Sequence, residues 1–480
     1  MFNLELVNKK QPKYLQLAEV VRETICKGQL LPGDVLPSVK ALSEDLQFNR
    51  HTVMRSFAEL IAEGWLESTE RVGYKVVSLL PIETSVLHSV NQKVDDKVID
   101  YRIVRSGANL PINKADTFKY NFSGGQPDID SFPFNEFKSY MSDTFTRPNS
   151  QQLGYGESAG TKDLISEVKD HLRKVRGVTD REIVITNGSQ EAIFIAAQLL
   201  LQQGDKVAVE ALGYPPAMSV FKNTGAELVT IKQDAEGLLP DDLEFNILQG
   251  NIRLIYLTPL HQYPTTVTLT VARRMKIYQL AATHNIPIIE DDYDHEFHYR
   301  CRPLAPMISQ DPKQLIIYIS TFSKIMFPGT RVGFMAINKN FATSVESYRM
   351  LISHKSNVLM QSALARWMKS GGFKRHLNRT TRLNLKRRDH AVLVLKQLDL
   401  FDFEIPDGGM ALWLQIKNTK VGAKELAEKA RSLGIYIQHE EEFHINPINN
   451  TDRYIRLGFA GMDELKFTKG IMLLAEIIKA

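Results

Sequence analysis

A lysine flanked by hydroxyl side chains is the chemically most suggestive feature of this sequence. Lys324 follows the apolar run 315–319, which is typical of a buried strand. The hydroxyls of Thr321 and Ser323, together with Arg331, can bind a phosphate dianion, and an amine beside that phosphate can form a Schiff base with an aldehyde. The combination predicts pyridoxal phosphate as cofactor. The alternative is an ordinary surface lysine at a strand end.

Other strand ends carry groups that suit the same cofactor. The turn Asn187-Gly188-Ser189-Gln190 opens an apolar helix, and free amides at a helix start bind phosphate. Asp291 ends the apolar run 286–290, where a carboxylate caps a turn or keeps a pyridine nitrogen protonated. Tyr214 stands in the turn 213–216 and can stack on a flat ring or serve as a core aromatic. We expect these groups to meet at one sheet edge.

Strand-like runs alternate with helical segments through the second part of the chain. Their spacing predicts an α/β architecture, with a largely parallel sheet and helices on both faces. In such a sheet, ligand-binding groups collect at the carboxyl ends of the strands. The predicted strands are 182–186, 206–210, 227–231, 253–257, 286–291, 315–320 and 332–336.

The first 78 residues predict a separate small helical unit. An apolar stripe over 14–25 ends at Gly28, and two shorter helices follow, with Ser38 and Asn49 as their N-caps. Two helices joined by a short turn are typical of a helix-turn-helix. The side chains expected to face inward on the second of these helices are Val53, Phe57, Leu60 and Ile61.

A DNA-reading surface is expected at the start of that second helix. Side chains and amides at a helix start meet phosphates and base edges, and short strands near 64–68 and 74–77 would add a wing. Residues 1–78 hold ten Lys/Arg and ten Asp/Glu, so any DNA-binding charge must be local. The same features also fit a small interaction module. The polar residues concerned are Asn49, Arg50, His51, Thr52 and Arg55.

Composition sets broad limits. A length of 480 residues allows about three domains, and 43% hydrophobic with 24% charged residues is ordinary for a globular protein. The two cysteines build no disulfide framework, and no apolar run reaches the roughly 20 residues of a membrane span. These features predict a cytoplasmic protein with no membrane segment and no metal site. Residues 79–118 show no sustained period and are expected to form a linker.

The first unit resembles the winged helix-turn-helix of GntR-type transcription regulators. The resemblance implies that residues 1–78 bind double-stranded DNA through Lys40, Arg50, Thr52 and Gly73. Met54 stands where some members carry a second arginine, so base preference does not transfer. The stretches that carry the resemblance are Gly28-Gln29-Leu30-Leu31-Pro32-Gly33-Asp34, Asn49-Arg50-His51-Thr52-Val53 and Glu63-Gly64-Trp65-Leu66-Glu67.

Residues 119–480 resemble the fold-type-I, class I aminotransferases. The resemblance implies a pyridoxal-phosphate domain with a smaller C-terminal α+β subdomain. Lys324 would carry the internal aldimine, Asp291 would pair with the pyridine nitrogen and Tyr293 would reach the phenolic oxygen. Arg456, in Tyr454-Ile455-Arg456-Leu457-Gly458, would bind a substrate carboxylate. The other cofactor-binding residues would be Gly188, Ser189, Gln190, Tyr214, Thr321, Ser323 and Arg331.

Two departures from the aminotransferase pattern concern the substrate side. Tyr263-Pro264-Thr265-Thr266 replaces the turn Asn-Pro-Thr-Gly, so the asparagine that supports the phenolic oxygen is absent. His261 or Gln262 is expected to substitute for it. Pro216 stands where some transcription regulators with an aminotransferase-like domain carry an arginine that binds effector. A different effector pocket is therefore expected.

Fusion of the two units resembles the MocR subfamily of GntR-type regulators over essentially the whole chain. The sequence therefore predicts a transcription regulator that senses an amine, an amino acid or the cofactor itself, rather than an enzyme. The alternative is an active aminotransferase with an accessory DNA-binding head. The resemblance also implies a head-to-tail homodimer, whose two heads would read two half-sites.

Overall fold

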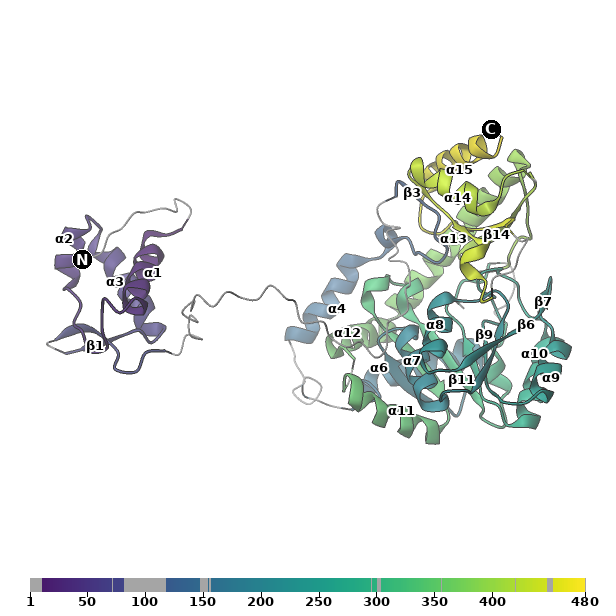
Figure 1. Cartoon of the computed structure of the whole chain (residues 1–480), viewed down its shortest axis with the longest axis horizontal. Helices are drawn as coiled ribbons and strands as arrows, with labels where there is room; N and C mark the ends of the chain where they lie inside the picture. Colours follow the sequence, from purple (N-terminus) through teal and green to yellow (C-terminus); the bar gives the residue numbers. More distant parts are fainter. Residues whose placement is uncertain are drawn as a thin grey trace, which may run out of the picture. The chain divides into compact units, whose positions relative to one another are not determined.

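The structure is a computed structural model in which the chain forms two compact units, residues 1–102 and 103–480 (Figure 1). Most of the predicted linker 79–118, together with Arg71 and Cys301, lies outside the described residues. The structure describes residues 11–70, 72–81, 118–146, 154, 157–294, 296–299, 304–354, 356–418, 420–446 and 452–479.

The first unit is a three-helix head with a two-stranded antiparallel wing. Both predicted N-caps are present: Ser38 Oγ accepts from the Ala41 amide at 3.2 Å, and Asn49 Oδ1 accepts from the His51 amide at 2.9 Å. These caps fix where the second and third helices begin. The elements are α1 (Lys13–Cys26), α2 (Val39–Asp45), α3 (Arg50–Ala62), β1 (Leu66–Thr69) and β2 (Gly73–Val76).

One side chain predicted for the core of the head lies outside it. Val53, Phe57 and Leu60 are fully buried, whereas Ile61 is 37% exposed. At 3.6 residues per turn, the three buried positions fall on one narrow stripe, and Ile61 is turned roughly 70° away from its centre. The prediction that Ile61 faces inward was therefore wrong.

The second unit is built on a seven-stranded sheet that contains every predicted strand. Six strands run parallel, and β12 runs antiparallel to both of its neighbours. β12 reverses because residues 322–332, which join it to β11, are too few for a crossover helix. The spatial order is β4 (Glu182–Thr186), β12 (Gly333–Ile337), β11 (Ile316–Thr321), β10 (Ile288–Asp291), β9 (Ile252–Leu257), β5 (Lys206–Glu210) and β6 (Glu227–Ile231).

Helices cover both faces of this sheet, as predicted. Neighbouring strand residues alternate between two apolar clusters: Val184 belongs to one, and Ile183 and Ile185 belong to the other. The cluster that contains Val184 includes residues of α7 (Ser189–Leu200), α8 (Pro215–Asn223) and α11 (Lys339–Ile352). The second includes residues of α6 (Lys162–Arg176), α9 (Pro240–Leu248), α10 (Val271–His284) and α12 (Val358–Lys369), the last of which also packs on α4 (Phe134–Thr146).

A smaller α+β subdomain follows the long helix α13 (Gly372–Leu398), as predicted (Figure 1). Its antiparallel sheet has the order β13 (Phe401–Asp402), β14 (Ala411–Ile416), β17 (Tyr454–Gly458) and β16 (Gln438–His439). Separately, β15 (Ile435–Tyr436) pairs in parallel with β3 (Tyr120–Asn121), near the start of the described part of the second unit. The helices of the smaller subdomain are α14 (Ala423–Ser432) and α15 (Glu464–Lys479).

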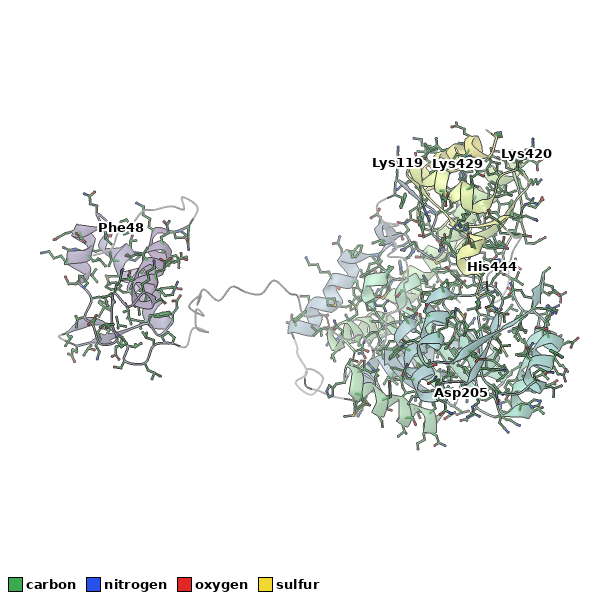
Figure 2. The ribbon with its side chains drawn as sticks, in the orientation of Figure 1. Phe48, Lys119, Asp205, Lys420, Lys429 and His444 are labelled. Carbon is green, nitrogen blue, oxygen red and sulfur yellow. The ribbon has the colours of Figure 1, made fainter. Side chains whose placement is uncertain are left out.

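The subdomain is joined to the large sheet by backbone contacts. His444, labelled in Figure 2, forms an isolated bridge with Leu212 in the loop after β5. In the same place the Gly213 amide donates to the Phe443 carbonyl at 3.0 Å. These contacts hold the segment after β16 close to the loop that follows β5. Among the described residues, no helix is both long enough and apolar enough to cross a membrane.

Candidate functional site

A cavity of about 220 Å³ lies where the parallel strands of the large sheet end. It is lined by every predicted cofactor and effector residue except Gly188 and the two candidates for the missing asparagine, His261 and Gln262. The cofactor residues meet because β4, β5, β10 and β11 finish at this edge, while the antiparallel β12 begins there. Arg456 comes from β17 of the smaller subdomain. No sequence pattern had pointed to five of the lining residues, which are Gly124, Gly125, Gln126, Thr258 and Pro328.

Lys324 presents its amine to this cavity from the short helical turn that follows β11. The half-buried side chain donates from Nζ to the Gly125 carbonyl at 2.7 Å. Burial, reinforced by the positive charge of Arg456, lowers the pKa of Lys324 to about 8, although Asp294 and Asp291 oppose the shift. A lysine with this pKa supplies a neutral, nucleophilic amine near physiological pH.

We expect uptake of pyridoxal phosphate by the apo protein to accelerate with rising pH and to level off above about pH 8. The neutral amine attacks an aldehyde and the ammonium does not, so the rate should follow deprotonation of Lys324. The measurement is the rate at which visible absorbance develops after mixing at a series of pH values. A midpoint near the ordinary lysine pKa of about 10.4 would contradict this prediction.

Phosphate-binding groups gather at the start of α7. Gly188, with φ +87°, precedes the helix and provides no side-chain cap, so the first amides of α7 remain available. Arg331 donates from Nη2 to the Asn187 carbonyl at 2.7 Å, and a Cβ at position 188 would come within 3.0 Å of that nitrogen. Glycine thus lets the guanidinium approach the helix start.

Two hydroxyls complete this end of the cavity. Thr321 and Ser323 are both buried, and the Thr321 hydroxyl donates to Ser323 Oγ at 3.0 Å. Gln190, by contrast, donates its side-chain amide to the Pro216 carbonyl at 3.0 Å, so that amide group is engaged by the protein. Hydroxyls, helix amides and a guanidinium together fit a phosphate dianion.

Asp291 provides the buried carboxylate that a pyridine nitrogen requires. It is 4% exposed; Oδ2 accepts from the Tyr256 hydroxyl at 2.8 Å, and Oδ1 has no hydrogen-bond partner among the described residues. Burial raises the pKa of Asp291 to about 7, with a further contribution from Asp292. A cationic ring N–H would both satisfy the unused oxygen and favour the charged carboxylate. The residues therefore fit pyridoxal phosphate.

The side chains expected to replace the missing asparagine are engaged elsewhere. Gln262 donates to the Leu212 and Tyr263 carbonyls, each at 2.7 Å, and His261 Nδ1 lies 2.7 Å from Asp294 Oδ1. Neither residue lines the cavity, which argues against the expected substitution. Tyr293 does line it, and its hydroxyl donates to the His261 carbonyl at 3.1 Å.

Arg456, from β17, lines the same cavity as a buried cation with unused donors. It is 1% exposed, and neither Nε nor Nη1 has a hydrogen-bond partner among the described residues. Its guanidinium lies over the Tyr263 ring, 4.4 Å from the centroid. A Cβ at Gly124 would overlap Nη1, so that glycine makes room for the guanidinium. A bidentate carboxylate is the ligand that best satisfies such a group.

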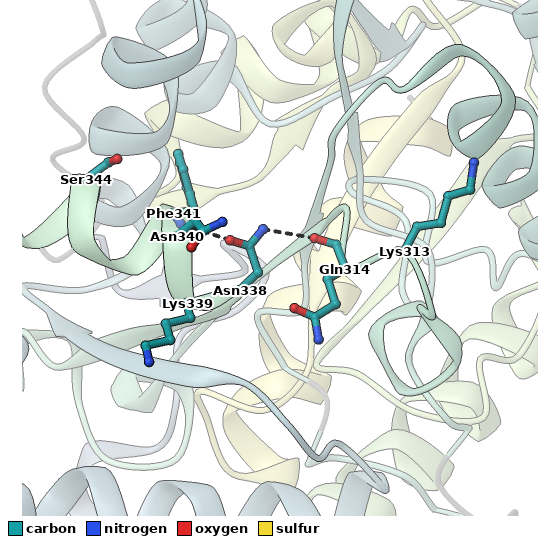
Figure 3. A pocket seen from close by; sticks show the side chains of 7 residues that line it. All are labelled: Lys313, Gln314, Asn338, Lys339, Asn340, Phe341 and Ser344. Atoms are coloured by element: carbon teal, nitrogen blue, oxygen red, sulfur yellow. Dashed lines mark hydrogen bonds between the residues drawn. The ribbon is translucent and has the colours of Figure 1, made fainter.

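A larger hollow of about 560 Å³, shown in Figure 3, lacks comparable chemistry. It lies between Gln314 and the start of α11. Asn338 donates to the Gln314 carbonyl at 3.0 Å and accepts from the Phe341 amide at 2.9 Å, so its side chain caps the helix. We assign no ligand to this hollow.

The head presents most of its predicted DNA-binding residues at the surface. Lys40, Arg50, His51 and Gly73 are exposed, and Thr52 is half-buried. Arg55 is also exposed, but its guanidinium lies over the Tyr14 ring, 4.1 Å from the centroid. Contact with DNA would therefore compete with this cation–π interaction.

Comparisons with known proteins give a family match for each of the two units. Residues 119–471 match the family "Aminotransferase class I and II", and residues 13–76 match "Bacterial regulatory proteins, gntR family". A crystal structure of Pyrococcus horikoshii kynurenine aminotransferase superposes with a TM-score of 0.70 and 27% identity, over 76% of this chain and 91% of that one. The chain belongs to the class I and II aminotransferase family.

Its DNA-binding head narrows the assignment. The probable rhizopine catabolism regulatory protein MocR of Rhizobium meliloti is 29% identical over 96% of this chain and 92% of its own. The pyridoxine biosynthesis transcriptional regulator PdxR of Corynebacterium glutamicum is 27% identical over 78% of this chain and 76% of its own. The chain is a GntR-type transcription regulator of the MocR subfamily, as the sequence predicted.

Proposed function

We propose that this regulator binds operator DNA through its head and senses an amino acid or another amine through pyridoxal phosphate held in its body. The observation that carries the proposal is the convergence of Lys324, Asp291 and Arg456 on one cavity of a chain with a GntR-type head. The cofactor, when bound, supplies an aldehyde that condenses with amines. Lys324 provides the competing amine, and Asp291 holds the proton at the ring nitrogen.

Arg456 makes a carboxylate-bearing effector the best candidate. Its unused donors are matched by a carboxylate and left unsatisfied by a simple amine. For the signal to reach the head, the effector must bind two arrangements of the protein with different affinity. A tenfold shift in that equilibrium requires about 1.4 kcal/mol of differential binding.

Two other functions are compatible with the same cavity. The protein would be an enzyme if it transaminated amino acids at roughly 1 to 1,000 turnovers per second and failed to bind its own upstream DNA. The name of the relative PdxR motivates the second candidate, in which the cofactor itself is the effector. Equal DNA affinity of the apo and cofactor-loaded forms would exclude that candidate.

We also propose that two chains pair head to tail. Support comes from the family resemblance and from exposed apolar side chains at the end of α11, where Met350, Leu351 and Ile352 are 55%, 82% and 45% exposed. Sedimentation equilibrium of the full chain tests this point. A monomer at micromolar concentration would exclude a stable dimer.

Replacing Arg50 by alanine is expected to weaken operator binding by roughly 1 to 3 kcal/mol. Arg50 is exposed in the first turn of α3, where a recognition helix contacts base edges. The measurement is a fluorescence titration with the DNA upstream of the gene, at fixed salt.

Lys27→Ala is the matched control for this measurement. It removes one exposed positive charge from the same head, at the end of α1, where Lys27 pairs with Glu23 at 2.8 Å. We expect its DNA affinity to stay close to that of the parent protein. Equal losses in the two variants would mean that α3 does not read bases.

A further inference from the structure

Glu210 is a buried carboxyl group that is hydrogen-bonded to a residue of the cavity lining, Thr258. It ends β5, is 2% exposed and forms no ion pair among the described residues. Its Oε2 accepts from both the amide and the hydroxyl of Thr258, at 3.3 and 3.1 Å. Burial raises the pKa of Glu210 to about 7, with Thr258 and Gln262 opposing the shift. Burying a carboxyl group is costly unless it is hydrogen-bonded, so the two bonds from Thr258 help to hold Glu210 in this place.

Thr258 connects Glu210 to the turn that contains Tyr263. It lines the cavity directly after β9, and its Oγ1 accepts from the Tyr263 amide at 2.9 Å. The hydroxyl donates its one proton to Glu210 and accepts from the Tyr263 amide through a lone pair, so the hydrogen bond to Glu210 fixes the direction in which the hydroxyl points. The orientation of the hydroxyl, and with it the position of the Tyr263 backbone, therefore depends on an acceptor at position 210.

Tyr263 in turn determines where Arg456 lies. Its ring centroid lies 4.4 Å from the guanidinium, and Gly124 approaches Nη1 so closely that no Cβ would fit there. Two nitrogens of Arg456 have no hydrogen-bond partner among the described residues, so ring and glycine contacts are what the structure shows holding this group. A shift of Tyr263 would displace the guanidinium.

We propose that Glu210 is a positioning residue of the effector site, which acts through Thr258 and Tyr263 to hold Arg456 where it meets an effector carboxylate. The inference rests on the proposed function, because the role of Arg456 toward a carboxylate belongs to that proposal. Glu210 lies outside the cavity lining. Its effect is on selection between ligands, and cofactor binding at Lys324 does not depend on it.

The test compares Glu210→Leu and Glu210→Gln in the cofactor-loaded full chain. Glycine and methylamine serve as a matched pair that differs by one carboxylate, and binding is followed by the change in cofactor absorbance. We expect Glu210→Leu to lower the glycine-to-methylamine affinity ratio by about tenfold or more, through loss of glycine affinity. Glu210→Gln should stay within about threefold of the parent, because its carbonyl oxygen can accept both Thr258 bonds.

Glu290→Gln is the matched control. Glu290 is a second buried carboxyl of the same sheet, bonded to the Met307 and Ile308 amides at 2.8 and 2.9 Å and outside the cavity lining. The glycine-to-methylamine affinity ratio of Glu290→Gln should equal that of the parent protein. Should Glu210→Leu not fold, Thr258→Val cuts the same relay with Glu210 in place and should lower the ratio in the same way.

Several outcomes would overturn the positioning role. An unchanged ratio in Glu210→Leu, or in Thr258→Val where the first variant does not fold, would show that no relay reaches Arg456. An equal loss in Glu210→Gln would show that the acceptor geometry is not what matters. Failure of the parent protein to bind the cofactor at Lys324 is a different result, since it would overturn the proposed function itself.

Discussion

Replacing Lys324 by alanine is expected to abolish the visible absorbance that pyridoxal phosphate gives this protein, while the fold stays intact. Lys324 is the lysine that lines the cavity, and its amine lies among the phosphate-binding groups, Asp291 and Arg456. Its one hydrogen bond within the described part of the chain, to the Gly125 carbonyl, contributes only about 1 kcal/mol to stability. The change therefore removes the covalent attachment point without removing core packing.

The measurement is borohydride reduction of the freshly purified protein followed by peptide mass spectrometry. The reduced cofactor should be found on Lys324 in the parent protein and on no residue in the variant. Lys313→Ala is the matched control, since Lys313 lines the hollow of Figure 3 and donates to the Ala282 carbonyl at 2.7 Å. A tag on any other lysine of the parent would disprove the cofactor assignment.

Most of this cavity could be predicted because its residues follow strands with clear local signals. Each apolar run ends in a turn whose polar residues are close in sequence, as in Thr321 to Lys324 at the end of β11. A parallel sheet brings such strand ends together whatever the lengths of its connections. The helix caps of the head, Ser38 and Asn49, are local signals of the same kind.

The missed wall of the cavity depends on contacts between distant segments. Gly124 to Gln126 reach the site because β3 pairs with β15, more than 300 residues later, and no periodicity reports such a pairing. The only local hint is the pair Gly124-Gly125, where two side chains are absent in succession. The structure shows the reason: side chains there would meet Arg456 and Lys324.

The wrong prediction at Ile61 and the unexpected side-chain directions of His261 and Gln262 have a common physical source. The sequence shows that an asparagine is absent from the turn, but the direction of the neighbouring side chains depends on partners elsewhere. Gln262 turns toward the loop after β5 and His261 toward Asp294. Ile61, similarly, is apolar yet lies beyond the buried stripe of α3. Residue type alone does not give the direction of a side chain.

Replacing Arg456 by alanine is expected to weaken glycine binding by about 2 to 5 kcal/mol, from roughly 30-fold to several thousand-fold. The loss combines two charge-assisted hydrogen bonds with the cost of leaving the ligand carboxylate in a buried site. Methylamine has no carboxylate, so its affinity should change far less. The measurement is the same absorbance titration of the cofactor-loaded protein with each ligand.

A second readout comes from Lys324, because the charge of Arg456 helps to lower its pKa. Removal of that charge should raise the pKa of Lys324, so the midpoint for cofactor uptake should move above about pH 8. Arg456→Lys keeps the charge but loses the planar fork; it should preserve the midpoint and recover only part of the glycine affinity. Equal losses for glycine and methylamine in Arg456→Ala would show that the arginine supports the cavity without selecting a carboxylate.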